Sequence, residues 1–253
     1  MFGILAAKSE AGLRDDLAAS CRLFASHAWA NFLLHGQFLS LRLPAASASV
    51  VAFLINPPGM LLADVCASDL VRIDVLRLPD GQIDVRGLPS SDNVQAIELH
   101  VHLHLTHAAS PELQCFFQAQ TVPCAAVAAM SCGLLPICQA SCFALQGGAI
   151  RWTVVDAARC PVSAVHKVVL SHAFGTITAG RAVAEAFHYM FYTANACEMQ
   201  VGAAAAGLRH LSFPPTDIAI THFAVTMERF QQQGLGHAIF EALRRSLPPS
   251  YKL

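Results

Sequence analysis

Charged residues are scarce in this sequence. Asp, Glu, Lys and Arg make up 13% of its 253 residues, whereas about 25% is usual for a soluble domain. The 16 basic and 17 acidic residues are scattered and give a net charge of −1. No cationic stripe is formed that could follow a phosphate backbone, so nucleic acid is not expected as a partner.

Long uninterrupted apolar runs are absent too, although 55% of the residues are hydrophobic and the mean hydropathy is +0.47. The most apolar stretch, 122–138, contains Pro123, Ser131 and Pro136 and is shorter than the roughly 20 residues of a bilayer span. We therefore expect no transmembrane segment. Burial against other protein subunits, in a homo-oligomer or a hetero-complex, explains this composition better; the alternative is an alanine-rich protein with a large ordinary core.

Paired cysteine motifs and a secretory signal are also lacking. The nine cysteines form no CxxC pair, and their number is odd. This pattern favours free thiols, most of them small buried hydrophobes, in an intracellular reducing compartment. The compartment is expected to be cytoplasmic or organellar, and a mitochondrial location is one of the options.

Common catalytic motifs are missing as well. The sequence has no Gly-x-Ser-x-Gly element and no phosphate-binding loop, and Gly147-Gly148 lacks the further glycines of a dinucleotide fingerprint. Nucleophilic catalysis and nucleotide binding therefore have no support from motifs.

Apolar periodicity indicates a layered α/β domain. Helices are expected over 10–32, with Ser9 as N-cap, and over 122–132, 181–205 and 221–232; strands are expected over 37–43, 50–55, 70–76, 150–155 and 167–170. The seam along 181–205 should face the core or a subunit interface. No linker-like stretch divides the chain, so a single domain over 1–253 is the simplest organisation.

Several segments resemble the class II aldolase/adducin domain family, in particular its bacterial-type branch close to the adducin head. The strongest is FLINPPGMLLADVCASDLVRID at 53–74, supported in the correct order by RLP at 42–44, MSCGLLP at 130–136, GRAVAEAF at 180–187, ACEMQ at 196–200 and PSYK at 249–252. The resemblance implies a three-layer α/β/α sandwich with a mainly antiparallel central sheet, usually assembled as a tetramer.

The same resemblance implies a divalent metal, typically zinc, held by two histidines of a His-x-His strand end and a third in an Asn-His-Gly turn. The aligned residues here are Gln118, Gln120 and Phe174. Carboxamides are weak zinc ligands and a phenyl ring is none, so we interpret these positions as a vestigial metal site. His172 would restore it only in part through a register shift. In the family's substrate-phosphate element, aligned with 37–40, only Ser40 remains.

One histidine-rich cluster offers an alternative: Glu98, His100, His102, His104 and His107. On a strand the first three histidines share a face; on a helix, which the resemblance implies, His100, His104 and His107 do. These three are the alternative metal ligands, and Glu98 and His107 are the alternative catalytic residues. A helix is expected to point these rings away from Gln118 and Gln120, whose amides would bond each other, the backbone or a neutral ligand.

The leading hypothesis is a non-catalytic structural or scaffolding subunit of a larger protein assembly, with no cofactor. The alternative is a metal-dependent lyase or epimerase acting on a sugar phosphate or a related hydroxy-carbonyl compound, with rearranged ligands. A metal-free variant of that enzyme would use Glu98 and the nearby histidines as acid/base groups.

Overall fold

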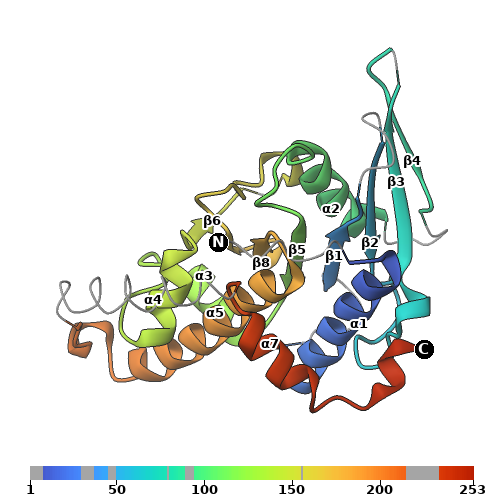
Figure 1. Ribbon diagram of the computed structural model, residues 1–253. Helices are drawn as coiled ribbons and strands as arrows, with labels where there is room; N and C mark the ends of the chain where they lie inside the picture. The colour runs from blue at the N-terminus through green and yellow to red at the C-terminus, as the bar shows by residue number, and fades with distance from the viewer. Residues whose placement is uncertain are drawn as a thin grey trace, which may run out of the picture.

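The structure, a computed structural model, describes residues 8–29, 37–44, 50–78, 80–88, 94–154, 156–214 and 234–253. Its centre is an eight-stranded sheet in the order β4-β3-β2-β1-β5-β8-β7-β6, flanked by helices on both faces (Figure 1). Every neighbouring pair is antiparallel except β6 and β7, which are parallel. The predicted mainly antiparallel α/β/α architecture is confirmed.

The strands are β1 (Phe38–Arg42), β2 (Val50–Ile55), β3 (Val71–Arg77), β4 (Ile83–Arg86), β5 (Cys115–Ala119), β6 (Ile150–Trp152), β7 (Val168–Ser171) and β8 (Gly175–Gly180). The helices are α1 (Glu10–Ser26), α2 (Val94–Thr106), α3 (Val122–Ala129), α4 (Gln139–Gln146), α5 (Val183–Ala204) and α7 (His237–Arg244). None of the helices in the described residues is long and apolar enough to cross a membrane.

Side chains alternate between the two faces of the sheet along the central strands, so a separate hydrophobic core lies on each face. Leu39 and Leu41 of β1 and Phe117 of β5 face the thicker layer, where they pack with residues of α1, α3 and α5. Their neighbours Phe38 and Phe116 face the opposite side, which α2 covers. The face under α2 is the one that carries the predicted site residues.

The two long helices follow the sequence pattern closely. Ser9 caps α1 by accepting a hydrogen bond from the amide of Gly12 at 3.3 Å. In α5 the predicted seam is core, because its first five members, Val183, Phe187, Met190, Ala194 and Cys197, are buried in the thicker layer. All nine cysteines are free, and four of them, Cys21, Cys115, Cys124 and Cys197, are fully buried.

Several predicted boundaries were wrong. The first helix ends at Ser26 instead of running to residue 32, with His27 as C-cap and Ala28 at a positive φ of 57°. The strand expected over 150–155 covers three residues, and β4, β8 and α4 were not predicted. The helix expected over 221–232 lies outside the described residues.

Candidate functional site

Gln118 lies on the central strand β5, on the face that α2 covers. Only 3% of its surface is exposed. Its Nε2 donates to the carbonyl of Phe174 at 2.9 Å, and its Oε1 lies 3.3 Å from Nε2 of His100. The protein therefore engages both ends of this amide.

Ser40, on the adjacent strand β1, joins the same cluster. Its Oγ lies 2.7 Å from Nδ1 of His100 and 2.8 Å from Nε2 of His104. All three residues are fully buried, and the two histidines are one helical turn apart on α2. The hydroxyl is therefore the bridge between strand β1 and the inner face of α2.

When both imidazoles are neutral, the hydrogen bonds all donate in one direction. They run from His104 through Ser40, His100 and Gln118 to the carbonyl of Phe174. The amide nitrogen of Gln118 is used as a donor, so its oxygen must accept the Nε2 proton of His100. Nδ1 of His100 then accepts from the hydroxyl of Ser40, and the hydroxyl oxygen accepts from Nε2 of His104. Nδ1 of His104 is left as a buried acceptor without a hydrogen-bond partner.

Burial keeps the two histidines neutral. It lowers the pKa of His100 to about 4, against a smaller opposing effect of its bond to Gln118. The pKa of His104 is well below its usual value, first because of burial and then because of repulsion from His100, when that ring is protonated, and from the charge of Arg42. His104 also stacks on Phe53, with ring centroids 4.3 Å apart. This environment stabilises a polar core; it does not expose an acid or base to a substrate.

The predicted vestigial metal positions lie near one another. Strand pairing places Gln118 opposite Ile177 of β8, so the end of β5 lies beside the turn that holds Phe174. Gly175 permits this approach: its φ is +74°, and a Cβ there would lie 2.6 Å from the carbonyl oxygen of Ala119. This is the glycine that the sequence aligns with the family's Asn-His-Gly turn, in which Phe174 would replace the histidine.

These residues do not fit a divalent cation. Both polar ends of Gln118 are occupied, and the ring of Phe174 stacks on Trp152 with centroids 5.1 Å apart. Gln120 follows the last residue of β5 and is half-buried. Two amides and a phenyl ring supply no imidazole or carboxylate ligand. Across the described ranges, no three His, Cys, Asp or Glu side chains converge as a metal would require.

The expectation that α2 points its histidines away from Gln118 was wrong for His100. The helix lies directly over β1 and β5, so the side chains on its inner face reach the sheet. The signal was available in the spacing, since His100 and His104 fall between the buried positions Ile97 and Leu105.

The remaining members of the histidine-rich cluster lie elsewhere. Glu98 is exposed on the outer face of α2, and His102 bonds Thr106 at 3.2 Å on the surface. His107 follows the end of α2, half-buried, with its ring centroid 6.0 Å from that of Phe116. His172 lies in the turn after β7, where its Nε2 contacts the carbonyl of Ala128. The alternative catalytic pair Glu98 and His107 is therefore not combined with the buried histidines in one open site.

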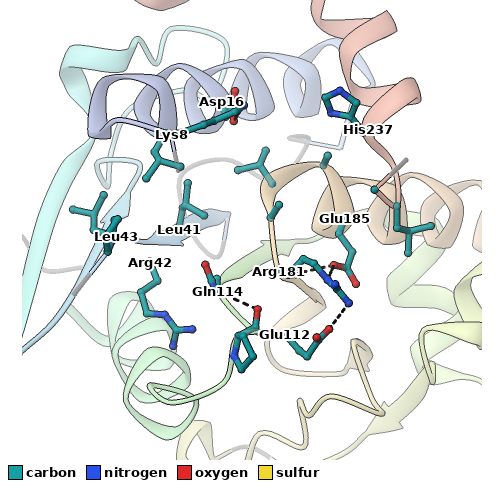
Figure 2. A pocket seen from close by; sticks show the side chains of 18 of the residues that line it. Lys8, Asp16, Leu41, Arg42, Leu43, Glu112, Gln114, Arg181, Glu185 and His237 are labelled. Carbon is teal, nitrogen blue, oxygen red and sulfur yellow. Dashed lines mark hydrogen bonds and ion pairs between the residues drawn. The ribbon is translucent and has the colours of Figure 1, made fainter. Parts of the chain in front are cut away.

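A cavity of about 1020 Å³ lies at the opposite strand ends, where α1, α5 and α7 meet the sheet (Figure 2). No residue that the sequence singled out as catalytic or metal-binding lines it. Its charged residues largely bond one another. Arg181 pairs with Glu112 at 2.6 Å and with Glu185 at 3.3 Å.

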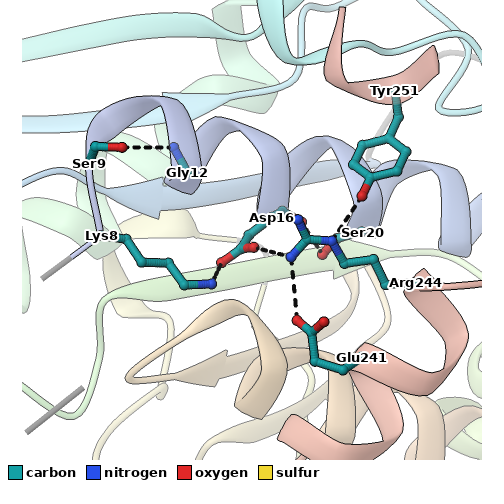
Figure 3. Close-up of polar contacts among 8 residues, drawn as sticks. All are labelled: Lys8, Ser9, Gly12, Asp16, Ser20, Glu241, Arg244 and Tyr251. Carbon is teal, nitrogen blue, oxygen red and sulfur yellow. Dashed lines mark hydrogen bonds and ion pairs between the residues drawn. The ribbon is translucent and has the colours of Figure 1, made fainter. Parts of the chain in front are cut away.

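Asp16 of α1 is the centre of a second ion-pair network beside this cavity (Figure 3). Its carboxylate accepts from Lys8 at 2.5 Å and from Arg244 of α7 at 2.7 Å, and Arg244 also donates to the hydroxyl of Tyr251. The network ties α1 to the C-terminal segment. Sequence reasoning could not find it, because Asp16 and Arg244 are 228 residues apart.

Comparison with known families gives one clear match. The model of the Class II Aldolase and Adducin N-terminal domain matches residues 15–201. Beta-adducin of Rattus norvegicus is 29% identical over 261 residues, which cover 95% of this chain. The chain spans about a third of that relative, since the match covers 34% of its length.

Bacterial relatives match over nearly their whole length. An aldolase class 2-type protein of Pseudomonas aeruginosa is 27% identical, with 94% of this chain and 91% of the relative covered. The crystal structure of an aldolase II superfamily protein from Pseudomonas syringae superposes with a TM-score of 0.72 at 27% identity, covering 98% of each chain. An L-fuculose 1-phosphate aldolase from Glaciozyma antarctica has a TM-score of 0.71 at 22% identity, covering 96% of this chain and 92% of the aldolase, and so shows a shared fold.

Proposed function

The chain belongs to the class II aldolase and adducin family, and we propose that it is a member without metal-dependent catalysis that serves as a structural or scaffolding subunit of a larger protein assembly. Family membership leaves both roles open, because the relatives include adducins as well as proteins named for aldolase activity. The choice between them rests on the residues at the aligned metal positions.

One observation carries the proposal: the amide of Gln118 is closed off inside the protein. Its oxygen and nitrogen bond His100 and the Phe174 carbonyl, and only 3% of the residue is exposed, so the amide is held in the protein interior and directed at protein partners. Lewis-acid chemistry requires an ion with an open coordination position, and no imidazole stands at any of the three aligned positions.

The composition supports the scaffolding part of the proposal. With 13% charged residues, the surface has less charge than is usual for a free soluble domain. Burial of part of this surface against other subunits would account for the difference. The partners are proposed to be protein chains, either further copies or different subunits.

Metal analysis of the purified chain, combined with a variant that restores the ligands, tests the catalytic part. We expect the natural chain to hold well below about one ion per chain and the variant Gln118→His, Gln120→His, Phe174→His to take up about one zinc ion, because three imidazoles form a zinc site. A matched variant, Gln114→His, places a histidine on the same side of the chain before β5 and should take up none.

The rival enzyme makes the opposite prediction. Stoichiometric zinc, iron or manganese in the natural chain, lost when His100, His104 or His107 is changed to Ala, would replace our proposal with a metal-dependent lyase or epimerase. Failure of a folded triple variant to bind zinc would show that these positions are not the family's metal positions.

A further inference from the structure

Strand β4 forms one end of the sheet and has a free outer edge. It pairs with β3 on one side, and no strand of the described residues pairs with its other side. The β3–β4 hairpin projects beyond the helical layers in Figure 1. An open edge exposes a row of unpaired amides and carbonyls, which is a template for another strand.

The hydrogen-bonding pattern shows which residues of β4 face outward. The amide of Leu78 donates to the carbonyl of Gln82 at 2.9 Å, and bonded pairs alternate along an antiparallel ladder. Asp84 and Arg86 are therefore bonded inward to Leu76 and Asp74. The backbone amides and carbonyls of Ile83 and Val85 face the free edge.

The charged side chains on this edge are complementary to those on the same edge of a second copy of the chain. Asp84 and Arg86 lie on the same face of β4, with the Arg86 Nε 2.8 Å from the Asp84 Oδ2. We propose that two copies of this chain pair antiparallel through their β4 edges about a two-fold axis at Val85. In that register Asp84 lies opposite the partner subunit's Arg86, and Arg86 lies opposite the partner subunit's Asp84.

Neighbouring registers are unfavourable on two grounds. An axis at Asp84 or Arg86 would place two like charges directly opposite each other, which is destabilising. It would also bring together residues whose backbone groups are already bonded to β3. The axis at Val85 instead joins the outward-facing groups, and it places the charged residues in the non-bonded pairs, where cross-strand side chains are closest.

The outer edge of β4 also carries exposed apolar surface, and the proposed register leaves space for it on the partner subunit. Ile83 is 54% exposed, and the proposed register places it opposite the partner subunit's Gly87, which has no side chain to obstruct it. A four-residue ladder is smaller than a standard stable interface, so a concentration-dependent dimer is expected. This pairing names a partner for the proposed scaffolding role, but it depends on the edge alone and not on the loss of the metal.

Sedimentation velocity over a concentration series, with two charge reversals, tests the pairing. Asp84→Arg makes this edge doubly basic and Arg86→Asp makes it doubly acidic, so each variant repels itself. We expect the sedimenting mass of the natural chain to increase with concentration in roughly the micromolar range, above that of any tetramer the family resemblance implies, and each single variant to raise the dissociation constant of this pairing at least about tenfold. An equimolar mixture of the two variants should recover the dimer, because each edge then meets its opposite.

Recovery of the association in the mixture would show that Asp84 and Arg86 pair between chains, because each variant has lost the Asp84–Arg86 ion pair within one strand. Glu198→Arg, an exposed reversal on α5, should leave the dimer unchanged. Hydrogen exchange of the natural chain should show that the outward-facing amides of Ile83 and Val85 become protected as the concentration rises, whereas those of Asp84 and Arg86 are already bonded to β3. A natural chain whose sedimenting mass does not rise with concentration, or single variants that associate as well as it does, overturns the proposal. The metal measurements are independent, so either proposal can fail alone.

Discussion

Ser40 has a structural role beneath α2, where its hydroxyl links His100 and His104. In the alignment that the sequence predicts, it is the one residue of 37–40 shared with the family's substrate-phosphate element. A buried polar group costs about 1–3 kcal/mol when it is left without a partner. The chain of bonds from His104 to Phe174 avoids that cost at every polar atom except Nδ1 of His104.

The buried histidines predict a loss of stability in acid. Burial lowers the pKa of His100 to about 4 in the folded chain, whereas an unfolded histidine has a pKa of about 6.5. The unfolded state therefore binds the proton first, so the contribution of neutral His100 is complete above about pH 6.5 and is lost as the pH falls towards about 4. We expect His100 alone to lower the free energy of unfolding by roughly 2 kcal/mol between about pH 7.5 and about pH 5, and the lowered pKa of His104 acts in the same direction.

Urea unfolding at both pH values measures this effect. The variant His100→Gln should remove most of the His100 contribution, and His102→Gln, half-exposed on the same helix, should retain it. Equal pH dependence in the natural chain and His100→Gln would show that this histidine does not control acid stability.

At the scale of elements, a buried ion pair fastens the start of α5 to the sheet. Lys167, immediately before β7, donates to Glu185 at 2.7 Å, and their side chains are 10% and 5% exposed. Glu185 lies in the first turn of α5 and also accepts from the amide of Arg181. The carboxylate thus stabilises a helix whose N-cap residue, Ala182, offers no side-chain cap.

Removing the charge of one partner of this pair should lower the free energy of unfolding more than removing both charges. Lys167→Met leaves the Glu185 carboxylate partly uncompensated, and we expect the free energy of unfolding to fall by about 3 kcal/mol. In the double variant with Glu185→Gln the loss should be smaller. A double-mutant cycle from urea unfolding gives the coupling, and Glu10→Gln, at an exposed ion pair with Arg14, should change stability by less than about 1 kcal/mol.

At the scale of the whole molecule, the proposed absence of a bound metal makes a prediction about thermal stability. The thicker layer forms a continuous core from α1 to α7 through β1 and β5, and this packing connects the elements to one another. A bound ion at about a thousand times its dissociation constant would add about 4 kcal/mol, which corresponds to roughly 8 °C or more in thermal midpoint for a chain of this size.

Chelator treatment should therefore leave the thermal midpoint within about 1 °C of its original value. The triple histidine variant loaded with zinc provides the positive control, since its midpoint should fall on chelation. A large drop for the natural chain would show that an ion contributes to its folded state.

The sequence by itself determined the family and the order and approximate limits of the main elements, and it predicts the loss of the metal ligands. These depend on local periodicity and on residue identities at aligned positions, such as Gln118 and Phe174. It did not determine β8, because the segment 175–180 begins and ends with glycine and has little apolar bulk. Only the tertiary structure decided that His100 reaches Gln118, that Asp16 meets Arg244 and that β4 has an open edge. The first two are contacts between residues of different elements, which depend on the packing of α2 and α7 against their neighbours. The open edge depends on the order of the strands in the sheet, and no local pattern encodes either.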